Sequence, residues 1–158
     1  MKERHFTLLS LTTLLFLSSC GPVDYSKSNL ITPEDFFNQS ENYYGVYYFS
    51  ETCPMCEASL PYINEYLNRL SKVDYSTGTI ENIYFIDAIA TPIDRYVEEN
   101  DFTAFYNSQI GVTDYTQVTQ VGYPILYIVQ NVNEVKTLVD VKIGKKQLTD
   151  YISSIWYL

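Results

Sequence analysis

Histidine and positive charge are scarce in this sequence. His5 is the only histidine among 158 residues, and 10 Lys and Arg residues stand against 19 Asp and Glu residues, for a formal net charge of −9. Because phosphate backbones are bound by clustered Lys and Arg, this balance argues against nucleic acid as a partner. Hydrophobic residues make up 46% of the chain. That share can build the core of one domain, and the length suits one domain rather than two.

Long apolar runs are also lacking. The run at residues 6–17 is interrupted by Ser and Thr and is too short to cross a bilayer. It follows Lys2 and Arg4, and a positive start before a short apolar run is typical of a signal peptide, which we expect over residues 1–19. The run closes with the letters LSSCG, ending at Gly21. This ending resembles the bacterial lipobox, in which the cysteine becomes the lipid-modified first residue of the mature chain.

The lipobox resemblance implies that Cys20 carries two or three acyl chains and tethers the protein to the outer face of a membrane. A plain secretory signal and a short anchor are the alternatives. Residues 20–31 are polar and rich in turn formers, so we expect a tether there and the folded domain over residues 32–158. Removal of residues 1–19 leaves 8 basic and 18 acidic residues, a net charge of −10, and no histidine. The mature chain therefore lacks Ser-His and Cys-His catalysis and histidine-ligated metal sites.

The cysteines are few and unevenly placed. A lipidated Cys20 cannot form a disulfide, which leaves Cys53 and Cys56, three residues apart. Outside the cytoplasm such a pair can cycle between dithiol and disulfide. A permanent disulfide that staples a turn is the alternative, although so short a loop removes little chain entropy. Zinc needs two more ligands, which neither Cys nor His can supply, so we expect no metal and no cofactor.

Hydrophobic patterns predict strands and helices in alternation. We expect buried strands at residues 43–50, 82–90 and 125–129, and a further strand at 135–141 that pairs antiparallel with the third. Thr followed by Pro, which occurs twice, is typical of a helix start. From these starts and from apolar spacing we expect four helices. The first begins at Thr32-Pro33 and the second after Cys56. The third begins at Thr91-Pro92 and continues towards Ile110, and the last runs from Gln147 to Trp156.

This order of elements resembles the thioredoxin fold family over residues 32–158. Four features carry the resemblance: Cys53-Pro54-Met55-Cys56 at a strand-to-helix junction, Pro61 within the following helix, Tyr123-Pro124 directly before a strand, and a strand, Gly144 and a final helix. It implies an α/β fold with a central mixed four-stranded sheet flanked by helices and a helical insertion before the cis-proline strand. The chain is similar to Gram-positive thioredoxin-like lipoproteins, including the bacteriocin-transport-accessory type.

The position of the cysteines indicates their chemistry. A helix N-terminus offers unpaired N–H groups and a partial positive charge that stabilise a thiolate. We therefore expect Cys53 to attack a substrate disulfide and the more buried Cys56 to resolve the mixed disulfide. The resemblance implies a cis Pro124, with an ordinary trans turn as the alternative. It also implies a substrate-binding surface, in which an extended substrate strand pairs with the backbone beside Pro124, formed by Tyr123, Pro124, Pro54 and Met55.

Two features depart from the family pattern. Thr52 stands where classical thioredoxins have Trp, and residues 43–50 contain no buried acid to handle the proton of the resolving cysteine. Glu57 and Glu51, acting through water, are the candidates for a proton relay, and a solvated surface charge is the alternative interpretation of both. The insertion at residues 91–120 either shapes a substrate surface or adds packing.

These observations lead to one principal hypothesis. The chain is expected to be a membrane-tethered, extracytoplasmic thiol–disulfide oxidoreductase whose partners are exported proteins with cysteines and a membrane thiol–disulfide protein that regenerates it. The alternatives are a thioredoxin-fold binding module with a static disulfide, and a metal-delivery protein of the copper-chaperone class, which the lack of histidine disfavours. The direction of electron flow stays open between reduction, oxidation and isomerisation.

Overall fold

The computed structural model of the chain describes residues 29–70, 79–98 and 101–155. The expected signal peptide, Cys20 and Trp156 lie outside the described residues. Strands, helices and 3₁₀ turns follow one another as β1 (Asn29–Leu30), η2 (Pro33–Asp35), β2 (Tyr43–Phe49), α1 (Pro54–Leu70), β3 (Asn82–Asp87), α2 (Phe102–Gln109), η3 (Tyr115–Gln117), β4 (Ile125–Val132), β5 (Val135–Ile143) and α3 (Gly144–Ser154). The mixed α/β organisation, a sheet flanked by helices, agrees with the sequence prediction. None of the helices in these described stretches is long and apolar enough to cross a membrane.

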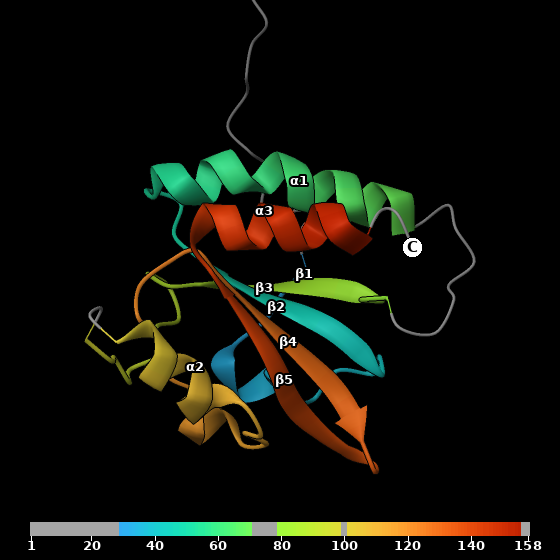
Figure 1. Cartoon of the computed structure of the whole chain (residues 1–158), viewed down its shortest axis with the longest axis vertical. Coiled ribbons are helices and arrows are strands. Elements are labelled where there is room, and N and C mark those ends of the chain that lie inside the picture. The colour runs from blue at the N-terminus through green and yellow to red at the C-terminus, as the bar shows by residue number, and fades with distance from the viewer. Residues whose placement is uncertain (1–28, 71–78, 99–100, 156–158) are drawn as a thin grey trace, which may run out of the picture.

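The strands form one mixed sheet in the order β1-β3-β2-β4-β5 (Figure 1). β1, β3 and β2 run parallel, β4 is antiparallel to β2, and β5 is antiparallel to β4. The antiparallel pairing of the last two strands was expected from the sequence. At their connection Asn133 and Glu134 both have positive φ, at 53° and 69°, which matches the twist that a two-residue hairpin needs.

The expected number of four strands is wrong, because β1 adds a fifth. Asn29 and Leu30 pair in parallel register with Tyr84 and Phe85, and the amide of Ile31 donates to the carbonyl of Phe85 over 2.9 Å. This short pairing covers backbone groups at the edge of β3 that would otherwise lack partners. Two residues are too few to show a hydrophobic alternation, so the sequence pattern places them in the tether. Pairing in the sheet thus begins before residue 32.

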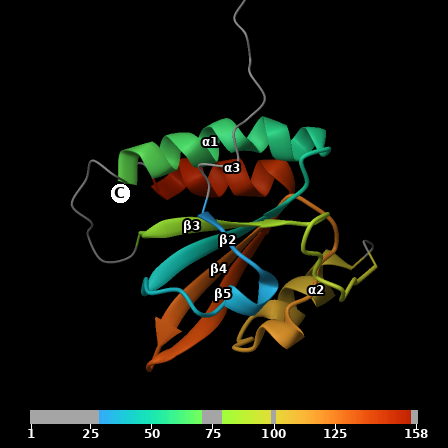
Figure 2. The same ribbon diagram turned by 180° about the vertical axis from the view of Figure 1, so that it is seen from behind.

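Different helices cover the two faces of the sheet. α1 and α3 lie side by side on one face, and α2 lies on the other, as the front and back views agree (Figures 1 and 2). Side chains along β2 alternate between the faces: Tyr44 and Tyr48 pack in the core on the α2 side, and Tyr47 and Phe49 pack in the core on the α1 side. β2 is buried on both faces, as its uncharged sequence predicts.

The first expected helix is only one turn long. Thr32-Pro33 opens the 3₁₀ turn η2, with Thr32 Oγ1 donating to the carboxylate of Asp35 over 3.0 Å. The chain then turns towards β2, and Phe36 enters the core on the α2 side. A helix start signal acts over a few residues, so it does not set how far the helix continues.

The helix expected from Thr91-Pro92 is wrong over the described residues 91–98, which form no helix. The backbone groups there pair with a later segment instead. The amide of Val97 donates to the carbonyl of Gln120 over 2.9 Å, and the amide of Gln120 donates to the carbonyl of Arg95 over 2.8 Å. The helical part of the insertion, α2, begins at Phe102 after the N-cap Asp101, whose side chain accepts from the amide of Ala104.

Candidate active site

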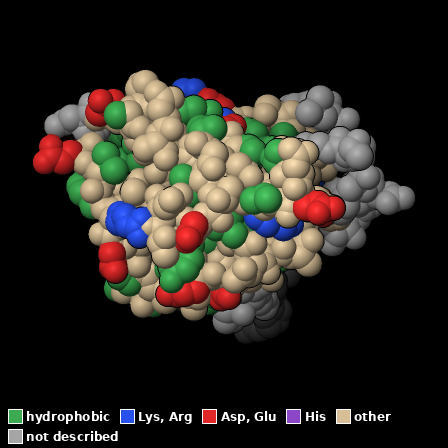
Figure 3. Space-filling model, turned by 90° about the horizontal axis from the view of Figure 1, so that it is seen from below, with side chains coloured by type: hydrophobic (Ala, Val, Ile, Leu, Met, Phe, Trp, Pro, Cys, Tyr) green, Lys and Arg blue, Asp and Glu red, His purple; other side chains and the backbone are tan. Residues whose placement is uncertain are grey.

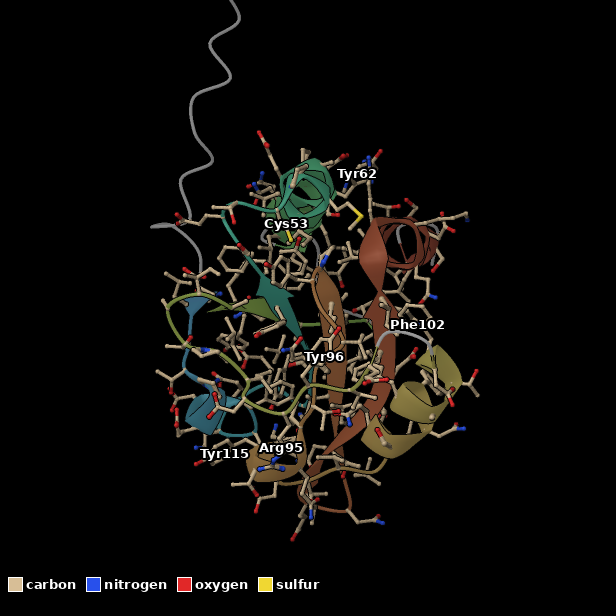
Figure 4. All side chains as sticks on the ribbon, turned by 90° about the vertical axis from the view of Figure 1, so that its left-hand side faces the viewer. Cys53, Tyr62, Arg95, Tyr96, Phe102 and Tyr115 are labelled. Carbon is tan, nitrogen blue, oxygen red and sulfur yellow. The ribbon has the colours of Figure 1, made fainter. Side chains whose placement is uncertain are left out.

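The turn between β2 and α1 places the two cysteines. The amide of Cys53 donates to the carbonyl of Ser50 over 3.1 Å, and the hydroxyl of Ser50 accepts from the amide of Thr52 over 3.2 Å. These bonds close a tight turn directly after the buried end of β2. Cys53 therefore stands just before α1 and Cys56 in its first turn, at the end of the molecule shown in Figure 4.

The sulfur of Cys53 lies at the N-terminus of α1. The backbone amide of Cys56 donates to Cys53 Sγ over 3.2 Å. Amides of the first helical turn have no partner within the helix, and the helix dipole adds a partial positive charge there. The Cys53 sulfur thus accepts from the type of group that stabilises a thiolate. Both cysteines are free thiols in the structure.

The two thiols differ in their access to solvent. Cys53 is 6% exposed and Cys56 is fully buried. Burial, which disfavours the charged form, raises the pKa of the Cys56 thiol well above its usual value, and the neighbouring Cys53 raises it further. Both thiols are thus buried, but Cys53 keeps a small exposed surface, whereas Cys56 has none and its thiol is held in the protonated form.

A segment distant in sequence completes the site. The carbonyl oxygen of Tyr123 lies 3.9 Å from Cys53 Sγ, and the Tyr123–Pro124 peptide bond is cis. The carbonyl of Pro124 accepts from the amide of Gly144 over 2.8 Å, which connects this segment to the start of α3. Pro124 is buried and the side chain of Tyr123 is 38% exposed. The structure thus brings Tyr123 and the two cysteines together.

The other residues selected from the sequence lie at the rim of the site. Pro54 is exposed, and Met55 exposes 53% of its surface beside the cysteines. Glu51 and Glu57 are also exposed. Among the hydrogen bonds of the described residues, none joins a thiol to the carboxylate of Glu51 or Glu57. The Cys53 sulfur accepts from the Cys56 amide and donates to the Tyr123 carbonyl.

Sequence reasoning missed Tyr47. Its side chain is fully buried in the core shared with both cysteines, and its hydroxyl donates to the carbonyl oxygen of Cys56 over 3.2 Å. The signal available was the alternation along β2, which assigns every second side chain to the face that α1 covers. Four tyrosines in the strand look alike in the sequence, so only the contact with α1 distinguishes this one.

Part of the insertion lies on the same side of the molecule as Cys53. Tyr96 and Phe102 expose 56% and 51% of their surfaces, and both lie on the side viewed in Figure 4, below Cys53.

On the face seen from below in Figure 1, hydrophobic side chains form small patches between charged side chains of both signs (Figure 3). Within residues 29–70, 79–98 and 101–155, no group of three or more His, Cys, Asp or Glu side chains is arranged to hold a metal ion.

No protein-family model matches this sequence. No curated protein matches it either. The chemistry of the site therefore follows from its own geometry: a thiol with a small exposed surface at a helix N-terminus, a fully buried thiol in the first helical turn, and an exposed residue whose backbone carbonyl lies beside the first sulfur.

Proposed function

We propose that this protein is an extracytoplasmic thiol–disulfide oxidoreductase with a thioredoxin-like fold, tethered to the membrane by lipid on Cys20. Its redox pair is Cys53 and Cys56, and its substrates are cysteines of exported proteins. A membrane thiol–disulfide protein regenerates it. The observation that carries the proposal is the hydrogen bond from the Cys56 amide to Cys53 Sγ over 3.2 Å, because it pairs a helix N-terminus with the sulfur that must carry negative charge.

The reaction proceeds in two exchanges. The Cys53 thiolate attacks one sulfur of a substrate disulfide, the substrate S–S bond breaks, and the second substrate sulfur leaves as a thiolate that takes up a proton. The Cys56 thiolate, formed by loss of its proton to solvent, then attacks Cys53 Sγ in the mixed disulfide. The first substrate sulfur leaves, and the Cys53–Cys56 disulfide forms. Two electrons pass from the protein to the substrate, and the same steps in reverse donate a disulfide.

The surroundings of Cys53 suit a polypeptide substrate. The Tyr123 carbonyl lies beside the attacking sulfur, and the exposed side chains of Met55 and Tyr123 lie at the same end of the molecule. An extended substrate segment that pairs with the backbone at Tyr123 would bring its sulfur to Cys53. The exposed Tyr96 and Phe102 lie on the same side of the molecule as Cys53 and offer further apolar contacts for flanking substrate residues (Figure 4).

The test is a redox titration of the full-length chain carrying Cys20→Ser, in which Cys53 and Cys56 are the only thiols. A reversible two-electron couple is expected. A potential near −270 mV assigns the protein as a reductant, and one near −120 mV as a disulfide donor. A disulfide that resists dithiothreitol, with no turnover of a protein substrate, would overturn the proposal in favour of a binding module with a static disulfide.

Tethering is tested separately with the wild-type chain. A Gram-positive host that expresses it should retain the protein in the membrane fraction, and mass spectrometry should find the lipid on Cys20. The Cys20→Ser variant should leave that fraction. Equal retention of the variant and the wild type would contradict a lipid anchor at this position.

A further inference from the structure

The resolving cysteine is buried among apolar side chains and has one hydroxyl beside it. Cys56 shares its core with Leu60 of α1, Leu126 of β4 and Leu148 of α3. Tyr47 enters the same core from β2, and its hydroxyl lies 3.2 Å from the Cys56 carbonyl oxygen. A thiolate formed at Cys56 would therefore carry its charge in apolar surroundings, where a nearby hydrogen-bond donor has a large effect.

The other tyrosines around this core direct their hydroxyls elsewhere. Tyr66 donates to the carbonyl of Ile80 over 2.6 Å, and the hydroxyls of Tyr43 and Tyr151 bond to each other over 3.1 Å. Besides Cys53, Tyr47 is thus the titratable side chain that acts on Cys56 from the elements packed around it. The charged Glu51 and Glu57 point into solvent at the surface.

We infer that Tyr47 is a positioning residue for the second exchange: its hydroxyl turns from the Cys56 carbonyl to the Cys56 sulfur and stabilises the thiolate that resolves the mixed disulfide. The inference rests on the proposed function. A hydroxyl hydrogen rotates about its C–O bond, so one phenol can serve both acceptors. Burial and the neighbouring Cys53 raise the pKa of Cys56, whereas hydrogen bonds from the Ser50 backbone and, to a smaller extent, from the Tyr47 side chain lower it.

The chemical balance of the step is simple. The Cys56 thiol loses its proton to solvent, Tyr47 keeps its own proton and donates a hydrogen bond, and the thiolate attacks Cys53 Sγ. The bond between Cys53 and the substrate sulfur breaks, and that sulfur leaves with the electron pair. Tyr47 is neither oxidised nor deprotonated, so its contribution is limited to the population and orientation of the Cys56 thiolate.

The test follows both exchanges in one reaction. Full-length chain with Cys20→Ser, fully reduced, is mixed with 5,5′-dithiobis(2-nitrobenzoate) in a stopped-flow instrument at several pH values. Attack by Cys53 releases the first thionitrobenzoate, and attack by Cys56 on the resulting mixed disulfide releases the second. Tyr47→Phe keeps the ring and removes the hydroxyl. We expect the first release to keep its rate and the second to slow about tenfold at neutral pH, with its pH profile moved to higher pH.

The matched control is Tyr44→Phe. Tyr44 is equally buried on the same strand, and its hydroxyl also donates to a backbone carbonyl, that of Phe36 over 2.9 Å, but it faces the α2 side. Tyr44→Phe should leave the rates of both thionitrobenzoate releases unchanged. If Tyr47→Phe does not fold, 3-fluorotyrosine at position 47 replaces it, because its more acidic hydroxyl is a stronger donor and should move the pH profile of the second release to lower pH.

The outcomes separate the inference from the proposed function. An unchanged second release in Tyr47→Phe, or an unchanged profile with 3-fluorotyrosine, overturns the role of Tyr47 while the Cys20→Ser parent chain still releases two equivalents. Equal slowing in Tyr44→Phe also overturns it, because the effect would then follow from lost core stability. A Cys20→Ser parent chain that releases a single equivalent and keeps the mixed disulfide contradicts the proposed function itself.

Discussion

The thiol of Cys53 lies 3.9 Å from the carbonyl oxygen of Tyr123, although 70 residues separate the two in the sequence. β2 and β4 are neighbours in the sheet, and the turn that follows β2 meets the segment that precedes β4. The sulfur and this backbone group therefore lie at the same end of the two neighbouring strands. The antiparallel pairing of two central strands, rather than any local motif, brings the parts of the site together.

The first prediction concerns the accessibility of the two thiols. Iodoacetamide applied to the folded, reduced Cys20→Ser chain should alkylate Cys53 first, because Cys53 is 6% exposed and Cys56 is fully buried with a raised pKa. Both cysteines lie on the tryptic peptide of residues 28–69, and fragmentation of this peptide in tandem mass spectrometry measures the two rates. In urea both sites should react alike, which serves as the control. Equal rates in the folded protein would contradict the burial of Cys56.

The second prediction concerns Gly45, in the middle of β2. A Cβ atom at this position would lie 2.9 Å from Leu126 Cδ1 and 3.3 Å from Ile83 Cγ1. Gly45→Ala should therefore lower the free energy of unfolding by about 1–3 kcal/mol, as overpacking of a core does. Urea denaturation measures the change. The double variant with Leu126→Val should lose less stability than the sum of the losses of the two single variants, because the smaller side chain relieves the clash. Strictly additive losses would argue against this clash.

The third prediction concerns the insertion. Gln109 is fully buried; its amide nitrogen donates to Thr119 Oγ1 over 2.7 Å, and its amide oxygen accepts from the amide of Thr119 over 2.9 Å. Gln109→Ala leaves these groups without partners and should destabilise the protein by about 1–3 kcal/mol. It should also speed hydrogen exchange at the Thr119 amide. Asn107→Ala, at an exposed position of α2, is the control with little expected loss.

The fourth prediction concerns alkaline pH. Burial raises the pKa of several tyrosines above the ordinary value of 10.0, to about 12 for Tyr84. It also raises the pKa of Tyr44, Tyr127 and Tyr151. The folded protein holds these protons more tightly than the unfolded chain, so the stabilisation is complete below pH 10 and is lost as the pH rises further. The melting temperature should fall between about pH 10 and about pH 12. A melting temperature that stayed constant from about pH 10 to about pH 12 would contradict this expectation.

Much of the local structure could be predicted from the sequence. The uncharged aromatic run of β2, the apolar spacing along α1 and the Tyr-Pro pair before β4 are patterns that depend on a few neighbouring residues, and the structure has these elements where the patterns place them. The pair of cysteines at the junction of β2 and α1 belongs to the same class of local signal. Such patterns are predictive because a helix or strand with one buried face has apolar residues at the spacing of its own geometry.

Other elements could not be predicted, because their backbone partners lie far along the chain. Residues 29–30 become a strand since the edge of β3 is open to them, and residues 95–97 remain outside a helix since their amide and carbonyl groups pair with Gln120. A helix start signal at Thr91-Pro92 is weaker than these tertiary hydrogen bonds. Propensity is a weak bias that tertiary context overrides.

The sequence by itself determined the chemistry that is present: two thiols three residues apart at a strand-to-helix junction, no histidine after residue 5, and a chain rich in tyrosine. Only the tertiary structure decided which groups lie beside those cysteines. It placed the Tyr123 carbonyl beside Cys53 and chose Tyr47 from the tyrosines of β2 as the neighbour of Cys56. The physical reason is that residue type and spacing are local properties, whereas burial and contact depend on how sheet and helices pack.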